Sequence, residues 1–218
     1  MIPSDNHGGR NEVSADLERT WILDARRGDE VAFARLVEAY QVPVYNLAYR
    51  MLGNPTEAED AAQETFLRAY TRLSTYDPDR KFSSWILSIA SHYCVDRLRR
   101  RRGNTLSMEE IQSGRWIPDE ETPRPEERTM EQERAQRVQL LLDELPPHYR
   151  QAIVLRYWHD CSYEEIAEIT QSSLSAVKSR LHRARQMMAS QMADGSAGVD
   201  VETDDRRKET ENELSQSF

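Results

Sequence analysis

Apolar residues recur every three or four positions through residues 16–102 and 131–193, which is the spacing of one face of an α-helix. Within residues 30–52 the positions that follow this spacing are Phe33, Leu36, Val37, Tyr40, Val44, Leu47, Ala48 and Met51. In neither stretch do apolar and polar residues alternate over enough positions to predict a β-strand. The sequence therefore predicts an all-α protein with two small helical domains, residues 16–102 and 131–193.

Polar segments flank and separate these domains. Residues 1–15 and 194–218 are polar, and residues 103–130 contain three prolines among acidic side chains. We expect a disordered N-terminus, a disordered acidic tail and a flexible acidic linker in these three segments. Within the domains, turns or breaks are expected at Pro43, 53–55, 77–81 and 145–149.

Three local signals predict where individual helices begin and end. Thr56 with Glu59, and Ser162 with Glu165, have the spacing of a capping box, in which two side chains close the first turn of a helix. Gly103 is expected to end the long helix that begins at Phe82.

Residues 162–185, SYEEIAEITQSSLSAVKSRLHRAR, predict two helices joined by a tight turn. Ser173 is a good N-cap for the second helix. One buried stripe is expected along it, at Leu174, Val177, Leu181, Ala184 and Met188. The opposite side has small polar residues at its start and cations along it. This arrangement is typical of a DNA-binding helix-turn-helix.

The location of the charge supports a polyanionic partner. The formal net charge of −9 lies in residues 103–130 (net −4) and 194–218 (net −5), so the rest of the chain is balanced. Lys178, Arg180, Arg183 and Arg185 share one helix with no acid among them. A solvated amphipathic helix is the alternative, but exposed helices usually mix charges of both signs. The missing acids favour DNA binding.

The first domain contains a cluster of acids at helical spacing. Glu57, Asp60 and Glu64 lie close to Gln63 and Leu67. Paired carboxylates can serve acid–base catalysis or a metal, but no histidine joins them and the chain has no glycine-rich phosphate loop. A solvated acidic face or a docking surface for a protein is favoured, with no enzyme activity, cofactor or metal.

Cations and aromatic residues lie close together at the start of the helix over 82–102. Arg80, Lys81, Phe82 and Trp85 combine the side chains that hold the backbone and stack the bases of single-stranded nucleic acid. The alternative is that Trp85 is a core residue. The helix has small polar residues on one side and ends in arginines, which also suit the negative end of a helix dipole.

The two cysteines, Cys94 and Cys161, match no metal-ligand spacing and indicate a reduced chain. No apolar stretch is long enough to cross a membrane, and the first residues contain no apolar run of a secretory signal. We expect a cytoplasmic protein without membrane insertion.

Three long motifs, in this order, resemble the bacterial RNA polymerase sigma factors of the extracytoplasmic-function (ECF) group within the sigma-70 family. AYRMLGNPTEAEDAAQETFLRAY and FSSWILSIASHYCVDRLRRRR resemble the family's second conserved region, and LPPHYRQAIVLRYWHDCSYEEIAEI with VKSRLHRAR resembles its fourth region. The implied partners are core RNA polymerase, through its β′ clamp and β flap, promoter DNA and an anti-sigma factor. The implied function is promoter-specific initiation of transcription.

The resemblance also implies roles for individual residues. The core polymerase would be bound by Glu57, Asp60, Gln63, Glu64 and Leu67. The −10 element would be held, melted and read by Arg80, Lys81, Phe82, Ser84, Trp85, Ser88, His92, Arg97, Arg99, Arg100 and Arg101. The −35 element would be read by Ser173, Ser175, Ala176, Lys178, Ser179, Arg180, His182 and Arg183.

The chain departs from the family in the turn of the helix-turn-helix. The family often has LGIPVGTV where this chain has TQSSLSAV, so Gln171 replaces a glycine. A free-standing helix-turn-helix regulator that binds an operator is the alternative function. It would explain residues 162–188 but leave residues 56–102 without a role.

Overall fold

The computed structural model describes residues 15–107 and 130–193, and every regular element in these two ranges is a helix. The all-α prediction is therefore confirmed for the described part of the chain. The expected disorder of the N-terminus, of most of the linker and of the acidic tail lies outside the described residues. The elements are α1 (Ala15–Arg26), α2 (Glu30–Leu52), α3 (Pro55–Arg72), a 3₁₀ turn (Leu73–Thr75), α4 (Phe82–Ser107), α5 (Met130–Asp143), α6 (Pro147–Trp158), α7 (Tyr163–Ile169) and a last helix, residues 174–193.

The start of α3 differs from the prediction. The helix begins at Pro55, and the side chain of Asn54 caps it by accepting a hydrogen bond from the backbone N–H of Glu57. The capping box predicted for Thr56 and Glu59 is wrong, because Asn54 followed by proline starts the helix two residues earlier.

The end of α4 is also later than predicted. The helix continues through Gly103 to Ser107, so the prediction that this glycine ends it is wrong. A glycine within a helix costs only about 1 kcal/mol relative to alanine, and the long helix before it is already nucleated. Pro43 is likewise accommodated inside α2.

The helix-turn-helix forms as the sequence predicts. Ser162 and Glu165 make a complete capping box at the start of α7, and the Ser173 hydroxyl accepts a hydrogen bond from the N–H of Ala176. In the turn, Gln171 has a φ of 49°, a left-handed conformation that suits the glycine expected at this position. Leu174 is more exposed than the predicted stripe implies, whereas Val177 and Leu181 are buried.

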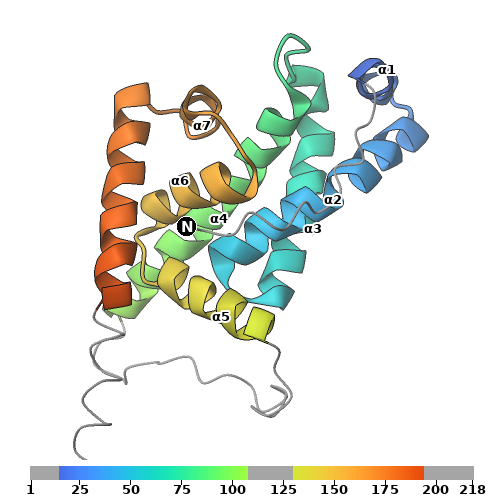
Figure 1. The fold of residues 1–218 in the computed structure, drawn as a ribbon. Coiled ribbons are helices and arrows are strands. Elements are labelled where there is room, and N and C mark those ends of the chain that lie inside the picture. The colour runs from blue at the N-terminus through green and yellow to red at the C-terminus, as the bar shows by residue number, and fades with distance from the viewer. Residues whose placement is uncertain (1–14, 108–129, 194–218) are drawn as a thin grey trace, which may run out of the picture.

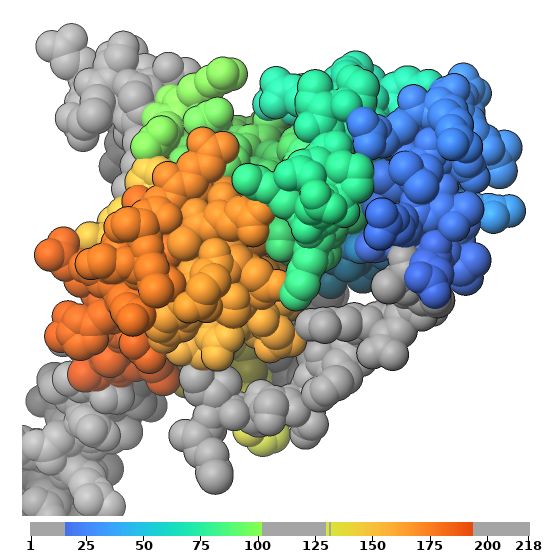
Figure 2. Space-filling view, turned by 90° about the horizontal axis from the view of Figure 1, so that it is seen from above, coloured from blue at the N-terminus to red at the C-terminus, as the bar shows by residue number. Residues whose placement is uncertain are grey.

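The two halves of the chain, residues 15–107 and 130–193, pack against each other and share one hydrophobic core. Helix α6 lies across α2 and α4, with α5 and the last helix beside it (Figure 1). Residues 150–155 of α6 are buried consecutively, which covers every side of the helix. The space-filling view shows the surface of the C-terminal half directly against that of α4 (Figure 2). Residues 16–102 and 131–193 were predicted as two separate domains, so this contact was not expected.

Polar side chains of the C-terminal half cap the C-terminus of α2. The last carbonyls of a helix have no partner within it. The carbonyl of Arg50 accepts a hydrogen bond from Gln139 (3.3 Å), and that of Met51 accepts one from the guanidinium of Arg150 (2.6 Å). Arg150 also contacts the carboxylate of Asp143 at 2.9 Å. This buried network fixes α5 and α6 on the end of α2.

Candidate functional site

The acidic side of α3 forms the first candidate surface. Asp60, Gln63 and Leu67 are exposed, and with Glu64 they line a hollow of about 490 Å³ completed by Tyr93 and Arg97 of α4. The structure thus brings together four of the five residues predicted to bind the polymerase. Leu67 is 60% exposed and places an apolar side chain next to the acids, one turn after Glu64.

The fifth residue of that set, Glu57, has a different environment. Its carboxylate pairs with the guanidinium of Arg101 and lies 3.7 Å from that of Arg97. These ion pairs join the first turn of α3 to α4. Glu57 therefore contributes to the position of the surface rather than to its exposed part.

An aromatic cluster supports the loop before α4. The rings of Tyr76, Phe82 and Trp85 contact one another, with centroids 5.1–5.4 Å apart. Phe82 is 2% exposed, so its side chain is a core residue and is not available to a ligand in this conformation. Trp85 is half-buried. The core interpretation of Trp85 therefore holds in part, because the ring packs on Tyr76 and Phe82, and its stacking on a base stays a prediction.

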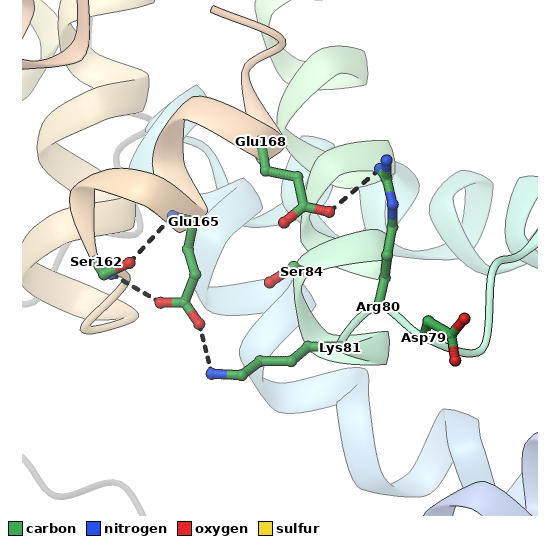
Figure 3. Close-up of a pocket in the computed structure, with 7 residues that line it drawn as sticks. All are labelled: Asp79, Arg80, Lys81, Ser84, Ser162, Glu165 and Glu168. Atoms are coloured by element: carbon green, nitrogen blue, oxygen red, sulfur yellow. Dashed lines mark hydrogen bonds and ion pairs between the residues drawn. The ribbon is translucent and has the colours of Figure 1, made fainter. Parts of the chain in front are cut away.

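The cations of this loop face the helix-turn-helix. Lys81 lies 2.7 Å from Glu165, and Arg80 lies 3.2 Å from Glu168, both on α7. These four residues and Ser84 line a hollow of about 420 Å³ between the two halves (Figure 3). The pKa of Glu165 is lowered, and the hydrogen bond from Lys81 is the largest contribution to this change.

The polar side of α4 is partly covered by α6. Ser88 and His92 are half-buried. Nδ1 of His92 lies 2.8 Å from the carbonyl oxygen of Ser88 and donates a hydrogen bond to it when Nδ1 carries the proton. Ser91 is fully buried, and its hydroxyl accepts a hydrogen bond from Gln151 at 3.1 Å. Arg150 and Gln151 of α6 were not predicted as interface residues. Two polar side chains within an apolar helix are nevertheless a signal of a buried contact.

The arginines of α4 point in different directions, because successive residues of a helix are 100° apart. Arg97 and Arg101 face Glu57, Arg99 contacts His148 of α6, and Arg100 is exposed. Since α4 continues to Ser107, these arginines are not in its last turn, and the helix dipole does not account for them.

The last helix presents the third candidate surface. Of the eight residues predicted to read the −35 element, six are exposed: Ser173, Ser175, Lys178, Ser179, His182 and Arg183. Ala176 is half-buried, and Arg180 turns inward, where its guanidinium donates to the Ser172 hydroxyl at 3.3 Å. Burial, followed by the charges of Arg99 and Arg180, lowers the pKa of His148. The predicted set therefore shares one exposed face, with Arg180 at its edge.

Other classes of site find no support in the described residues. No group of three or more histidine, cysteine, aspartate or glutamate side chains in these ranges could hold a metal ion. Cys94 and Cys161 are both buried, and burial raises the pKa of the Cys94 thiol to about 12. Among the described helices, none has the length and apolar character needed to cross a membrane.

Comparison with known families matches both halves of the chain. The model of sigma-70 region 2 matches residues 36–104, and that of sigma-70 region 4 matches residues 135–188. The region 2 match covers the part of the chain that a helix-turn-helix regulator alone would leave unexplained, so that alternative is not favoured.

Several curated proteins are similar over most of their length. The ECF RNA polymerase sigma factor SigW of Bacillus subtilis is 36% identical, over 79% of this chain and 95% of its own. SigE of Mycolicibacterium smegmatis is 35% identical, over 85% of this chain and 72% of its own. Among solved structures, CnrH in complex with the cytosolic domain of CnrY has the same fold, with a TM-score of 0.61 and 24% identity over 82% of this chain and 99% of that one.

Proposed function

The chain belongs to the ECF sigma factors of the sigma-70 family, and we propose that its three candidate surfaces divide the work of starting transcription. The protein binds core RNA polymerase and directs it to selected promoters in the cytoplasm. The observation on which this division rests is that exposed acids gather on α3, whereas exposed cations gather on the last helix.

The acidic side of α3 is the proposed contact with the β′ clamp. Asp60 and Glu64 supply charge, Gln63 supplies hydrogen bonds, and the exposed Leu67 supplies the apolar contact that interface centres favour. Glu57 holds α3 against α4, so its replacement is expected to weaken binding indirectly. Contact with the β flap is assigned to the C-terminal half.

Promoter DNA is proposed to contact both halves. The loop at Arg80–Lys81, Ser84, the open side of Trp85, Ser88 and His92 hold and read the separated −10 strand, in which one base is flipped into a pocket before Ser84. Arg97, Arg99, Arg100 and Arg101 hold phosphates of the adjoining duplex. The −35 major groove receives the exposed face of the last helix, with Ser173, Ser175, Ala176, Ser179 and His182 nearest the bases and Lys178, Arg180 and Arg183 as the cations. No step of this function requires a catalytic residue or a cofactor.

Charge reversal on α3 tests the polymerase contact. Asp60→Arg with Glu64→Arg is expected to abolish co-purification with core polymerase in the absence of DNA. The matched control is Glu38→Arg with Glu133→Arg, which reverses two exposed acids on α2 and α5. Equal recovery of the polymerase with both double variants would refute the assignment.

A salt series tests the −35 contact. Arg180→Ala is expected to weaken promoter binding by about 1–3 kcal/mol if the guanidinium reaches a base edge. Lys178→Ala is expected to act mainly through the slope of affinity against salt concentration, as the loss of a phosphate contact does. If Arg180→Ala changes only the slope of affinity against salt concentration, Arg180 contacts a phosphate and not a base.

An anti-sigma factor is the proposed regulator.

A further inference from the structure

A tyrosine of α4 lies beside the acidic side of α3. Helix α4 packs against α3 (Figure 1), and Tyr93 is half-buried where it lines the hollow next to Asp60 and Glu64. Tyr93 was not among the residues predicted to bind the polymerase. Its side chain contacts two arginines, one from each helix, and through them it reaches two carboxylates of α3.

The face of the Tyr93 ring carries Arg68 of α3. The guanidinium carbon of Arg68 lies 4.9 Å from the centroid of the ring, within the range of a cation–π contact. Nε of the same guanidinium donates to Oε1 of Glu64 at 2.7 Å. Glu64 precedes Arg68 by one turn, which is the favourable order for an ion pair along a helix. Arg68 therefore links the tyrosine ring to a carboxylate of the acidic surface.

The hydroxyl of Tyr93 is held from the other direction. It accepts a hydrogen bond from the guanidinium of Arg97 at 3.2 Å. Arg97 lies one turn later in α4, and its Nε is 3.7 Å from the carboxylate of Glu57. The ring of Tyr93 is thus restrained at its hydroxyl end while its face supports Arg68.

We propose that Tyr93 is a positioning residue for polymerase binding, because its ring holds Arg68 and Arg68 holds the carboxylate of Glu64 in the orientation that the polymerase binds. The inference rests on the proposed contact between α3 and the polymerase. Arg68 uses Oε1 of the carboxylate, and 34% of the Glu64 side chain is accessible to solvent, so a partner can still reach it. A side chain that is already ordered loses less conformational entropy when a partner binds.

The exposure of the ion pair explains why the ring is needed. The side chains of Arg68 and Glu64 are 38% and 34% exposed, and an ion pair at this exposure orders its partners only weakly. The cation–π contact adds a second restraint on the same guanidinium. Ordering one long side chain on binding weakens affinity by about two- to twelvefold, which is the loss expected when the ring is removed.

The test compares two substitutions of Tyr93 in the full chain. The Kd for core polymerase is measured without DNA, with thermal unfolding recorded for every variant. Tyr93→Leu removes the ring and is expected to weaken binding by about two- to twelvefold. Tyr93→Phe keeps the ring beneath Arg68 and is expected to restore most of this loss. The control is Trp21→Leu, which removes an aromatic ring 5.9 Å from the guanidinium of Arg35, outside the hollow.

A double-mutant cycle separates positioning from a general effect on the fold. Tyr93→Leu is repeated in a chain that carries Glu64→Ala. If Tyr93 acts through Glu64, its replacement causes no further loss of affinity in that background. A role in stability alone, or a direct contact of the ring with the polymerase, would give the same loss in both backgrounds and would overturn the proposal.

Two other results would also contradict it. Unchanged or tighter binding by Tyr93→Leu would show that Arg68 only screens the charge of Glu64. A Tyr93→Phe variant as weak as Tyr93→Leu would exclude the face of the ring as the support. Failure of the proposed function appears separately, because Asp60→Arg with Glu64→Arg would then still bind the polymerase.

Discussion

Replacement of Arg150 tests the buried network at the end of α2. The residue is 4% exposed, and its guanidinium donates to the carbonyls of Met51 and Asp143 and to the Asp143 carboxylate. Hydrogen bonds that involve a charged group contribute about 1.5–3 kcal/mol each, and removal of one partner of a buried ion pair costs about 3–5 kcal/mol. Because 41% of the Asp143 side chain is exposed, its carboxylate stays hydrated after the arginine is lost. We therefore expect Arg150→Ala to lower the free energy of unfolding by about 3 kcal/mol, the low end of that range.

Thermal and urea unfolding followed by circular dichroism measure this loss. For a chain of this size about 3 kcal/mol corresponds to a Tm lower by about 6–12 °C. Arg150→Lys keeps the charge but lacks the planar guanidinium that donates to several acceptors at once. Its free energy of unfolding is expected to lie between those of the wild type and Arg150→Ala. Arg134→Ala, which removes an exposed arginine of α5, is the control. A loss below about 1 kcal/mol, equal to that of the control, would show that the guanidinium does not bridge α6 and α2 in solution.

Three further predictions concern single side chains. Gln171→Gly should raise the free energy of unfolding by about 0.5–1 kcal/mol in urea titrations, because glycine relieves the left-handed backbone of the turn; an unchanged midpoint would argue against that conformation. Cys94 should resist alkylation at pH 8 in the folded chain, since burial raises its thiol pKa to about 12, and should react only as urea unfolds the protein. The pKa of His148 is lowered by burial and by Arg99 and Arg180, so folding favours its neutral ring. The Tm should then fall as the pH drops below about 6.5, and a His148→Gln variant that keeps the full dependence would exclude this residue as the cause.

Most of the helices could be predicted from the sequence because their signals are local. The capping box of Ser162 and Glu165 depends on residues three apart, and the turn at 145–149 depends on its two prolines. The start of α3 and the end of α4 were misjudged where two local signals compete. Asn54 with Pro55 outweighs Thr56, and an established helix outweighs Gly103.

The candidate site was predictable only in part, because its partners come from distant parts of the chain. The acids of α3 and the cations of the last helix can be found from charge and spacing alone. The contact of Lys81 with Glu165 joins residues 84 positions apart, and no pattern within either segment indicates it. Phe82 shows the same limit, because an aromatic ring beside cations can stack on a base or pack in a core. Its contacts with Tyr40, Tyr76 and Trp85 show that it packs in the core, and these contacts cannot be predicted from the local sequence.

Helix α6 limits how the protein can be dissected. A fragment that ends at residue 107 would leave the apolar sides of α2 and α4 in water, and a fragment that begins at residue 130 would do the same for Ile153 and its neighbours. Either piece alone is expected to self-associate at working concentrations. Weak or absent binding by an isolated fragment could therefore result from aggregation and would not show that the fragment lacks a binding surface. Point substitutions in the intact polypeptide are the better way to assign each surface.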